Sequence, residues 1–410
     1  MRSVFFIFVA LVLMNSCATH HSEQKKPFIT QRQGQFFIGD SAYYFIGANF
    51  WYGAILGSTG RGGDRDRLLK ELDVMKEKGI TNLRILVGAD GPEGQAVKIR
   101  PTLQISPGVY NDTIFDGLDF LLAEMGKRDM YAVLYLNNSW EWSGGYGQYL
   151  EWAGQGAVPE KGVHDWPVFV AHVSKYADCD SCHTLFHHHI KHVLGRTNRY
   201  TKVPYTEDPS IMSWQVGNEP RAFSDEGKAP FARWLKESVA LIRSLDSNHL
   251  VSIGSEGSWG CEMDMQLFED IHADEHVDYL TMHIWPKNWS WIDSEHIPET
   301  MNVAIENTNE YIAAHIAVAN KLNKPIVIEE FGFPRDNHLY TVNSPTENRD
   351  HYYQNIFDHI VRSAKEGTVL AGCNFWGWGG VWTATASFLA TLGRLCRGSV
   401  ARGARFEFCF

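Results

Sequence analysis

The chain has 410 residues, of which 44% are hydrophobic and 13% aromatic. This length suffices for one large α/β domain or for two ordinary domains. The formal net charge of −11 argues against a broad electrostatic attraction to nucleic acid, so we expect no nucleic-acid partner. The 14 tryptophans favour a ligand with flat apolar faces.

Residues 1–17 have the pattern of an export signal. Arg2 precedes an apolar run, Val4–Met14, that is too short to span a bilayer. Cys17 follows and resembles the lipidated first residue of a bacterial lipoprotein, whereas plain secretion with cleavage nearby is the alternative. We therefore expect an exported protein, secreted or held in the cell envelope (outer membrane or periplasm), whose only membrane attachment is a lipid anchor at Cys17. Residues 18–27 would then form a polar tether, and we expect a monomer.

The chain from residue 28 onward predicts a β-hairpin followed by eight strand–helix units. The hairpin covers residues 28–47, with turns at Gly34 and Gly39. The predicted strands are residues 46–49, 81–87, 130–136, 211–216, 250–254, 277–283, 325–330 and 369–376. The predicted helices are residues 64–78, 112–128, 229–245, 263–273, 308–322 and 348–365, and residues 166–194 are expected to be mostly helical.

This alternation predicts an α/β protein with a (β/α)₈ TIM barrel, formed as one domain by residues 28–382. A doubly wound open sheet is the alternative, but no glycine-rich dinucleotide fingerprint follows the first strand. Residues 137–159, rich in Trp, Gly and Tyr, are interpreted as a long surface loop.

The C-terminal residues 383–410 differ abruptly in composition from the rest of the chain. They are rich in Ala, Arg and Ser, and Glu407 is their only acidic residue. We interpret this atypical tail as the product of an altered reading frame, which would leave the last barrel helix missing or replaced. An ordinary amphipathic C-terminal helix is the alternative.

Two of the predicted strands end in carboxylates. The strand before Gly217 leads into Asn218, Glu219 and Pro220, and the strand from residue 325 ends in Glu329 and Glu330. In a closed barrel, the C-terminal tips of the strands share one open face. Two facing carboxylates, one protonated and one ionised, are the arrangement that glycoside hydrolysis uses. A separation of about 5–5.5 Å allows direct attack on carbon, and a wider gap admits water instead.

An ordered series of short motifs then makes the pattern specific. Between residue 28 and about residue 380 the chain resembles glycoside hydrolase family 5, and within it the endo-β-1,4-mannanase branch. The matching stretches are residues 47–51 (GANFW), 83–85 (LRI), 136–145 (LNNSWEWSGG), 196–198 (RTN), 208–221 (DPSIMSWQVGNEPR), 254–257 (GSEG), 283–286 (HIWP), 328–332 (IEEFG) and 374–377 (NFWG).

The resemblance implies a reaction and two catalytic residues. Glu219 would be the general acid/base and Glu330 the nucleophile of a retaining double displacement on β-1,4-mannan, glucomannan or galactomannan. Glu329 would point into the barrel wall or behind the site. This chemistry needs no cofactor. The alternatives are a β-1,4-glucanase of the same family and a non-catalytic glycan-binding surface lipoprotein.

Further residues are expected to bind substrate or support the carboxylates. Arg84 can hydrogen-bond the nucleophile and keep it ionised, and Asn218 can contact a substrate 2-hydroxyl. His283 would orient a carboxylate or contact the sugar. Glu256 matches the mannanase branch and is expected to contact the substrate. The expected sugar platform is Trp376, and the tryptophans expected at neighbouring subsites are Trp51, Trp140 and Trp285.

A cluster of cysteines and histidines follows residue 178. It contains Cys179, Cys182 and five histidines at positions 183, 187, 188, 189 and 192. The spacing is not that of a zinc finger, and no second CxxC is present. We therefore expect no metal site, and we interpret the cluster as a disulfide or free thiols beside a His-rich helix face.

Overall fold

The computed structural model describes residues 26–93, 99–159, 165–338 and 344–380. The predicted export signal, the tether up to residue 25 and the atypical tail lie outside these residues, so the expectations about them stay predictions. No helix of the described part of the chain is long and apolar enough to cross a membrane.

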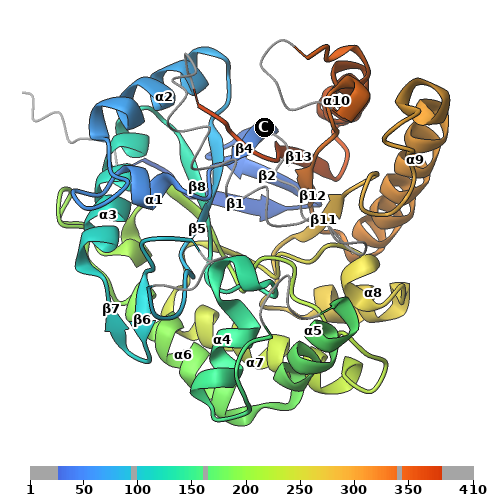
Figure 1. Cartoon of the computed structure of the whole chain (residues 1–410). Coiled ribbons are helices and arrows are strands. Elements are labelled where there is room, and N and C mark those ends of the chain that lie inside the picture. Colours follow the sequence, from blue (N-terminus) through green and yellow to red (C-terminus); the bar gives the residue numbers. More distant parts are fainter. Residues whose placement is uncertain (1–25, 94–98, 160–164, 339–343, 381–410) are drawn as a thin grey trace, which may run out of the picture.

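Eight parallel strands form the core of the molecule, in the spatial order β10-β9-β8-β5-β4-β13-β12-β11. Figure 1 shows them at the centre of a ring of helices. The pairing of β13 with β4 brings the last strand beside the first, which confirms the predicted (β/α)₈ barrel. The strands are β4 (Phe45–Asn49), β5 (Asn82–Leu86), β8 (Tyr131–Tyr135), β9 (Ile211–Gln215), β10 (Leu250–Ser252), β11 (Leu280–Ile284), β12 (Ile326–Phe331) and β13 (Leu370–Phe375).

Individual hydrogen bonds join β10 to β11, where the described residues have no continuous strand ladder. The backbone N–H of Asp278 donates to the carbonyl of Val251 over 2.8 Å, and that of His283 donates to the carbonyl of Glu256 over 3.1 Å. The Thr281 hydroxyl adds a third bond, to the carbonyl of Ser255, at 2.9 Å. We refer to this junction between β10 and β11 as the seam.

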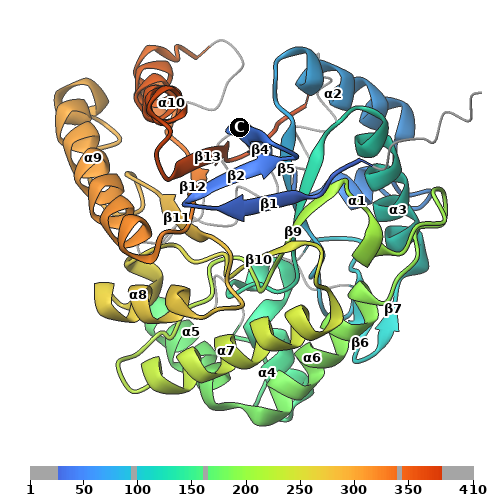
Figure 2. The same ribbon diagram turned by 180° about the vertical axis from the view of Figure 1, so that it is seen from behind.

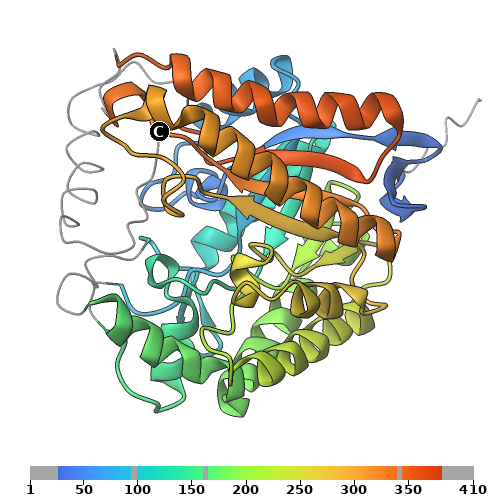
Figure 3. The same cartoon turned by 90° about the vertical axis from the view of Figure 1, so that its right-hand side faces the viewer.

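The helices run along the outside of the barrel, as the side view of α9 and α10 in Figure 3 shows. Local sequence signals set their ends: Asp64 caps α2 by accepting from the N–H of Arg67, and Gly367 ends α10 in the left-handed region. The helices are α1 (Gly53–Leu56), α2 (Arg65–Glu77), α3 (Asp112–Lys127), α4 (Gly145–Trp152), α5 (Trp166–Val173), α6 (Asp180–Leu194), α7 (Lys228–Leu245), α8 (Met265–Ala273), α9 (Ile297–Leu322) and α10 (Glu347–Glu366).

Two of the sequence expectations differ from the structure. Helix α9 begins at Ile297 instead of residue 308, because Pro298 fits its first turn. Residues 137–159 are not simply a surface loop, because they contain α4 with six consecutive buried residues from Gly145 to Leu150. The Tyr146 ring of α4 stacks on Tyr176 at 3.8 Å. The glycines and aromatic residues of α4 give little helical signal in the sequence, and packing against the rest of the fold stabilises the helix instead.

Cys179 and Cys182 form a disulfide at the start of α6. Their sulfur atoms are therefore not available as metal thiolates. Of the neighbouring histidines, His189 is fully buried and its Nε2 lies 2.7 Å from the carbonyl oxygen of Val87. This contact joins the α6 ring of His189 to the chain just after β5.

A small antiparallel sheet closes the N-terminal end of the barrel (Figure 2). It lies within the predicted hairpin, residues 28–47, and has three strands: β1 (Ile29–Arg32), β2 (Gln35–Ile38) and β3 (Ser41–Tyr43). Phe36 of β2 is fully buried in a separate apolar cluster with residues from the starts of the barrel strands. Its ring meets that of Tyr279 edge-on at 5.2 Å. The sheet therefore acts as an apolar plug.

We predict that Phe36→Ala lowers the free energy of unfolding by about 3–5 kcal/mol, because it leaves a cavity in the plug. Urea denaturation followed by tryptophan fluorescence would measure the loss. Phe37→Ala is the matched control, since Phe37 is half-buried and carries the Arg32 guanidinium 3.8 Å above its ring. Equal losses in the two variants would contradict the plug.

Candidate active site

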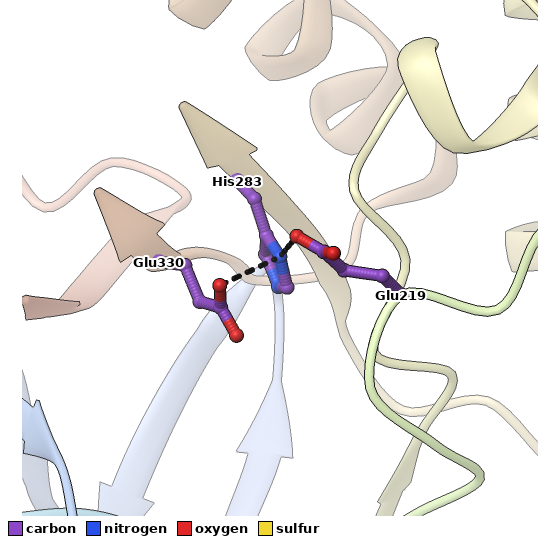
Figure 4. A group of neighbouring side chains, drawn as sticks. All are labelled: Glu219, His283 and Glu330. Atoms are coloured by element: carbon purple, nitrogen blue, oxygen red, sulfur yellow. Dashed lines mark hydrogen bonds and ion pairs between the residues drawn. The ribbon is translucent and has the colours of Figure 1, made fainter. Parts of the chain in front are cut away.

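Glu219, His283 and Glu330 meet at the C-terminal ends of their strands (Figure 4). Glu219 follows β9, His283 lies on β11 and Glu330 on β12. The β11–β12 register shifts between Met282 and His283, and such a bulge re-aims the side chain beside it. All three side chains are almost fully buried, with Glu219 at 1%, His283 at 0% and Glu330 at 3% exposure.

The backbone holds Glu219 in an uncommon conformation. Its φ of 50° lies in the left-handed region, which a non-glycine residue adopts only when its surroundings enforce it. Here its N–H donates to the carbonyl of Gly254 over 3.0 Å. Its own carbonyl accepts from the Ser139 hydroxyl over 2.5 Å. The turn thereby aims the carboxyl group into the barrel mouth.

Both carboxyl oxygens of Glu219 have partners. His283 Nδ1 lies 2.7 Å from Oε1, and the Trp140 indole N–H donates to Oε2. The same His283 nitrogen lies 3.6 Å from Oε2 of Glu330. Oxygens of Glu219 and Glu330 lie within 4.8 Å of each other. The site therefore holds two carboxyl groups close enough together to act on one glycosidic bond.

Arg84 supplies the positive charge of the site. It is fully buried, and its Nη1 donates to Oε1 of Glu330 over 2.5 Å. The same nitrogen donates to Oδ1 of Asn218 over 2.9 Å and to Oδ1 of Asn49 over 3.2 Å. The guanidinium also lies over the Tyr135 ring, 4.4 Å from its centroid. Arg84 thus joins three strand ends to one carboxylate.

Burial and mutual repulsion set the protonation of the two carboxyl groups. Burial raises the pKa of Glu219, and the Trp140 hydrogen bond opposes this. Burial and then the charge of Glu219 raise the pKa of Glu330, against the effect of Arg84. We place the shared proton on Glu219, because the guanidinium stabilises a charge on Glu330 directly. Burial also lowers the pKa of His283 well below its ordinary value, so its ring is neutral.

Glu256 is a third carboxyl group near the site, in the loop after β10. Burial, followed by the charge of Glu219, raises the pKa of Glu256 to about 8. Its Oε2 lies 3.5 Å from the Arg221 guanidinium. Its backbone carbonyl accepts from the Tyr311 hydroxyl over 2.8 Å. Sequence reasoning placed Glu256 near the substrate, and the structure places it beside the acid/base candidate.

The expected tryptophans occupy different positions around the site. The rings of Trp285 and Trp376 are 6.3 Å apart and nearly perpendicular. Trp140 contacts Glu219 itself, which the sequence did not indicate. Trp51 is half-buried and reaches Trp376 through Trp142, with ring distances of 6.1 and 6.2 Å. Trp142 was not singled out from the sequence, although it lies in the quoted stretch 136–145.

Polar residues inside the strands also escaped sequence reasoning. Gln215 of β9 accepts from Arg84 Nε over 2.8 Å. Asn49 of β4 accepts from Arg84 and donates to the carbonyl of Glu329 over 2.8 Å. A polar residue within an otherwise apolar strand is the signal that could have found Gln215 and Asn49. Glu329, which was expected in the barrel wall or behind the site, lies inside the barrel with 1% exposure.

Two carboxyl groups and an imidazole this close together could also be ligands of a metal ion. Within the described residues, Glu219, His283 and Glu330 are the group of three whose potential ligand atoms lie within 4.8 Å of one another. The Arg84 guanidinium, however, already bonds Glu330. A second cation beside it would meet electrostatic repulsion, so we assign these donors to proton chemistry.

Comparison with known proteins supports this interpretation. Residues 26–391 match the sequence profile described as GH family 5 beta-mannosidase-like. The chain belongs to glycoside hydrolase family 5. Mannan endo-1,4-beta-mannosidase 7 of Arabidopsis thaliana is 31% identical to this family 5 chain over 385 residues, covering 90% of the chain and 83% of the relative. Mannan endo-1,4-beta-mannosidase 4 of Solanum lycopersicum is 34% identical, covering 67% of the chain and 66% of that relative.

Solved structures agree with the family assignment. A glycoside hydrolase family 5 mannosidase from Rhizomucor miehei superposes with a TM-score of 0.80 at 35% identity, covering 87% of this chain and 86% of that one. The endo-1,4-beta-D-mannanase from Thermotoga petrophila has a TM-score of 0.63 at 23% identity, covering 84% and 90%. The second likeness supports the barrel fold alone.

We predict that, between pH 5 and pH 8, the free energy of unfolding of Glu256→Gln rises relative to that of the unaltered chain. Because the folded-state pKa of Glu256 is raised to about 8, the folded chain binds a proton in this range that the unfolded chain has lost. The unaltered chain therefore loses stability as pH rises, and the glutamine variant avoids this loss. Denaturant unfolding at both pH values would measure it.

Glu262→Gln is the control, because it removes the other carboxylate bound to Arg221. The difference in free energy of unfolding between Glu262→Gln and the unaltered chain should vary less with pH than the difference for Glu256→Gln. A Glu256→Gln difference that is the same at pH 5 and pH 8 would contradict a raised pKa.

Proposed function

We propose that this chain is an endo-acting, retaining hydrolase of β-1,4-mannosidic bonds in mannan, glucomannan or galactomannan. The observation that carries the proposal is the pair of buried carboxyl groups, Glu219 and Glu330, facing each other within 4.8 Å. This closeness favours a retaining mechanism, because an inverting one needs room for water between the carboxyl groups. The relatives named as mannan endo-1,4-beta-mannosidases support the substrate and the endo mode.

The reaction would proceed in two displacements. In the first, the Glu330 carboxylate attacks the anomeric carbon while Glu219 gives its proton to the leaving glycosidic oxygen. The bond between the anomeric carbon and the glycosidic oxygen breaks, and the sugar is left covalently attached to Glu330. In the second, Glu219 takes a proton from water, whose oxygen attacks the same carbon and releases Glu330. The two inversions restore the original configuration.

The surrounding residues support each role. Arg84 keeps Glu330 ionised, while His283 and Trp140 hold the Glu219 carboxyl in one orientation. The amide of Asn218 uses its oxygen for Arg84 and one N–H for Oδ1 of Asn138, at 3.2 Å. Since an amide nitrogen carries two hydrogens, the second can donate to a substrate 2-hydroxyl. That contact strengthens in the transition state.

The aromatic walls fit a pyranose substrate. Trp285 and Trp376 present nearly perpendicular rings, and the backbone N–H of Trp376 donates to the carbonyl of Phe331, the residue after Glu330, over 2.9 Å. The apolar face of a sugar ring can pack against such an indole. We propose that Trp376 is the platform for the sugar that Glu330 attacks.

We predict that Glu219→Ala and Glu330→Ala each lower kcat on galactomannan by several orders of magnitude, since removing either carboxyl group removes one half of the double displacement. Reducing-sugar release measures this, with a thermal melt of each variant as the folding control. An aryl β-mannoside that needs no proton donation should retain first-step activity in Glu219→Ala but not in Glu330→Ala. Variants that fold and keep near-normal rates would contradict the assignment.

A mannosidase acting on chain ends is a second candidate. The family match is described as beta-mannosidase-like, and the family 5 mannosidase from Rhizomucor miehei superposes with a TM-score of 0.80. We predict that an endo enzyme lowers the viscosity of galactomannan before free mannose accumulates. Mannose appearing from the start, at unchanged viscosity, would favour the chain-end mode. Faster hydrolysis of carboxymethylcellulose than of galactomannan would instead favour a β-glucanase.

A further inference from the structure

Glu329 is a buried acid that the double displacement does not use. It precedes Glu330 on β12, and its side chain is only 1% exposed inside the barrel. Its Oε2 accepts from Nε2 of Gln215 over 2.7 Å. Its Oε1 faces the Tyr279 hydroxyl at 3.4 Å. An acid buried this deeply costs stability unless its charge and hydrogen bonds are compensated, so its partners need an explanation.

The contacts of Glu329 orient the amide of Gln215. The Gln215 nitrogen donates both to Glu329 and to the Ser252 hydroxyl, the latter over 2.9 Å. With both hydrogens of the amide used, the amide oxygen faces the other way. There it accepts from Nε of Arg84 over 2.8 Å. Glu329 therefore determines which end of Gln215 meets the guanidinium.

Arg84 is held from both sides as a result. Its Nε edge faces Gln215, with Oε2 of Glu329 3.6 Å away. Its Nη1 end reaches Oε1 of Glu330 over 2.5 Å. One guanidinium thus lies between two neighbouring carboxyl groups of the same strand. The position and the effective charge of Arg84 at Glu330 depend on Glu329.

We propose that Glu329 is a positioning residue: it fixes Arg84 through Gln215 and takes up part of its positive charge, so that Glu330 stays ionised yet nucleophilic. This inference rests on the proposed function. A carboxylate paired too strongly with a guanidinium is a weaker nucleophile, whereas an unpaired one beside Glu219 becomes protonated. Glu329 would set the balance between these two limits.

The charged and titratable neighbours give the sign of the expected effect. Arg84 of β5 and Tyr279, next to β11, face Glu329, and Tyr135 of β8 lies under the guanidinium. Glu330 is faced by Arg84, by His283 of β11 and by the carboxyl groups of Glu219 and Glu256. When Glu329 is neutral, it no longer offsets the positive charge of Arg84, which then acts more strongly on Glu219 and Glu330. Both members of that pair should then lose their protons at lower pH.

The test is the pH dependence of kcat/KM for an aryl β-mannoside in Glu329→Gln. Both the acidic limb, which reports ionisation of Glu330, and the basic limb, which reports protonation of Glu219, should move to lower pH. A shift of about one pH unit is expected when one charge is lost from the neighbouring carboxyl group on the other side of Arg84. We expect kcat to fall about tenfold, because a small displacement of Arg84 misplaces the attacking carboxylate of Glu330.

Two further variants separate positioning from general damage to the barrel interior. Tyr279→Phe removes the other hydrogen bond to Glu329 without changing charge, so both limbs should stay in place. Gln215→Met cuts the link to Arg84 and keeps every charge, so kcat should fall with KM nearly unchanged and without the joint acidic shift. If Glu329→Gln shows no cooperative melt, Gln215→Met decides: wild-type kcat in that variant overturns the proposal.

The outcomes distinguish this inference from the proposed function. An unaltered chain that hydrolyses no mannan or mannoside would refute the proposed function. An active chain whose Glu329→Gln profile superimposes on its own would refute the positioning role alone. Equal shifts in Glu329→Gln and Tyr279→Phe would also refute it, because they would show a general disturbance.

Discussion

The ion pair between Arg84 and Glu330 is the interaction on which the open end of the barrel depends. Taking both groups out of water costs several kcal/mol per ion, which the pair recovers only if its other hydrogen-bonding atoms are satisfied. Asn49 and Asn218 accept from the same Nη1 of Arg84 that bonds Glu330, and Gln215 accepts from its Nε. Asn49 lies on β4, whereas Gln215 and Asn218 lie at the end of β9 and just after it. The charge therefore also ties the strand ends together.

The two ends of the barrel solve opposite problems. The N-terminal end is closed by apolar side chains around Phe36, which need only fit and exclude water. The C-terminal end keeps carboxyl groups, an imidazole and a guanidinium within hydrogen-bonding distance of one another. Because the two ends are separate, the apolar plug can stabilise the chain while the polar site keeps its charged and titratable groups together. This division is the usual one in TIM barrels.

The sequence allowed the barrel and the two strand tips to be predicted, because those signals are local. Apolar runs that end in carboxylates locate Glu219 and Glu330, and the resemblance to family 5 gives them roles. The contacts that define the site are not local: Trp140 lies 79 residues from Glu219, and Gln215 lies 114 residues from Glu329. Helix α4 escaped for a related reason, since its glycines and tyrosines form a helix only against their neighbours in the fold.

The seam between β10 and β11 has a consequence for how this protein can diverge. Strand β10 ends at Ser252, and beyond it the loop carbonyls of Ser255 and Glu256 complete the circle of strands. Loops at a barrel mouth ordinarily accumulate substitutions freely, because the strands beneath them provide the stability. Here one such loop also closes the ring. A substitution near Glu256 that adjusts substrate choice therefore also acts on barrel closure, so selection for new specificity and selection for stability meet in the same few residues.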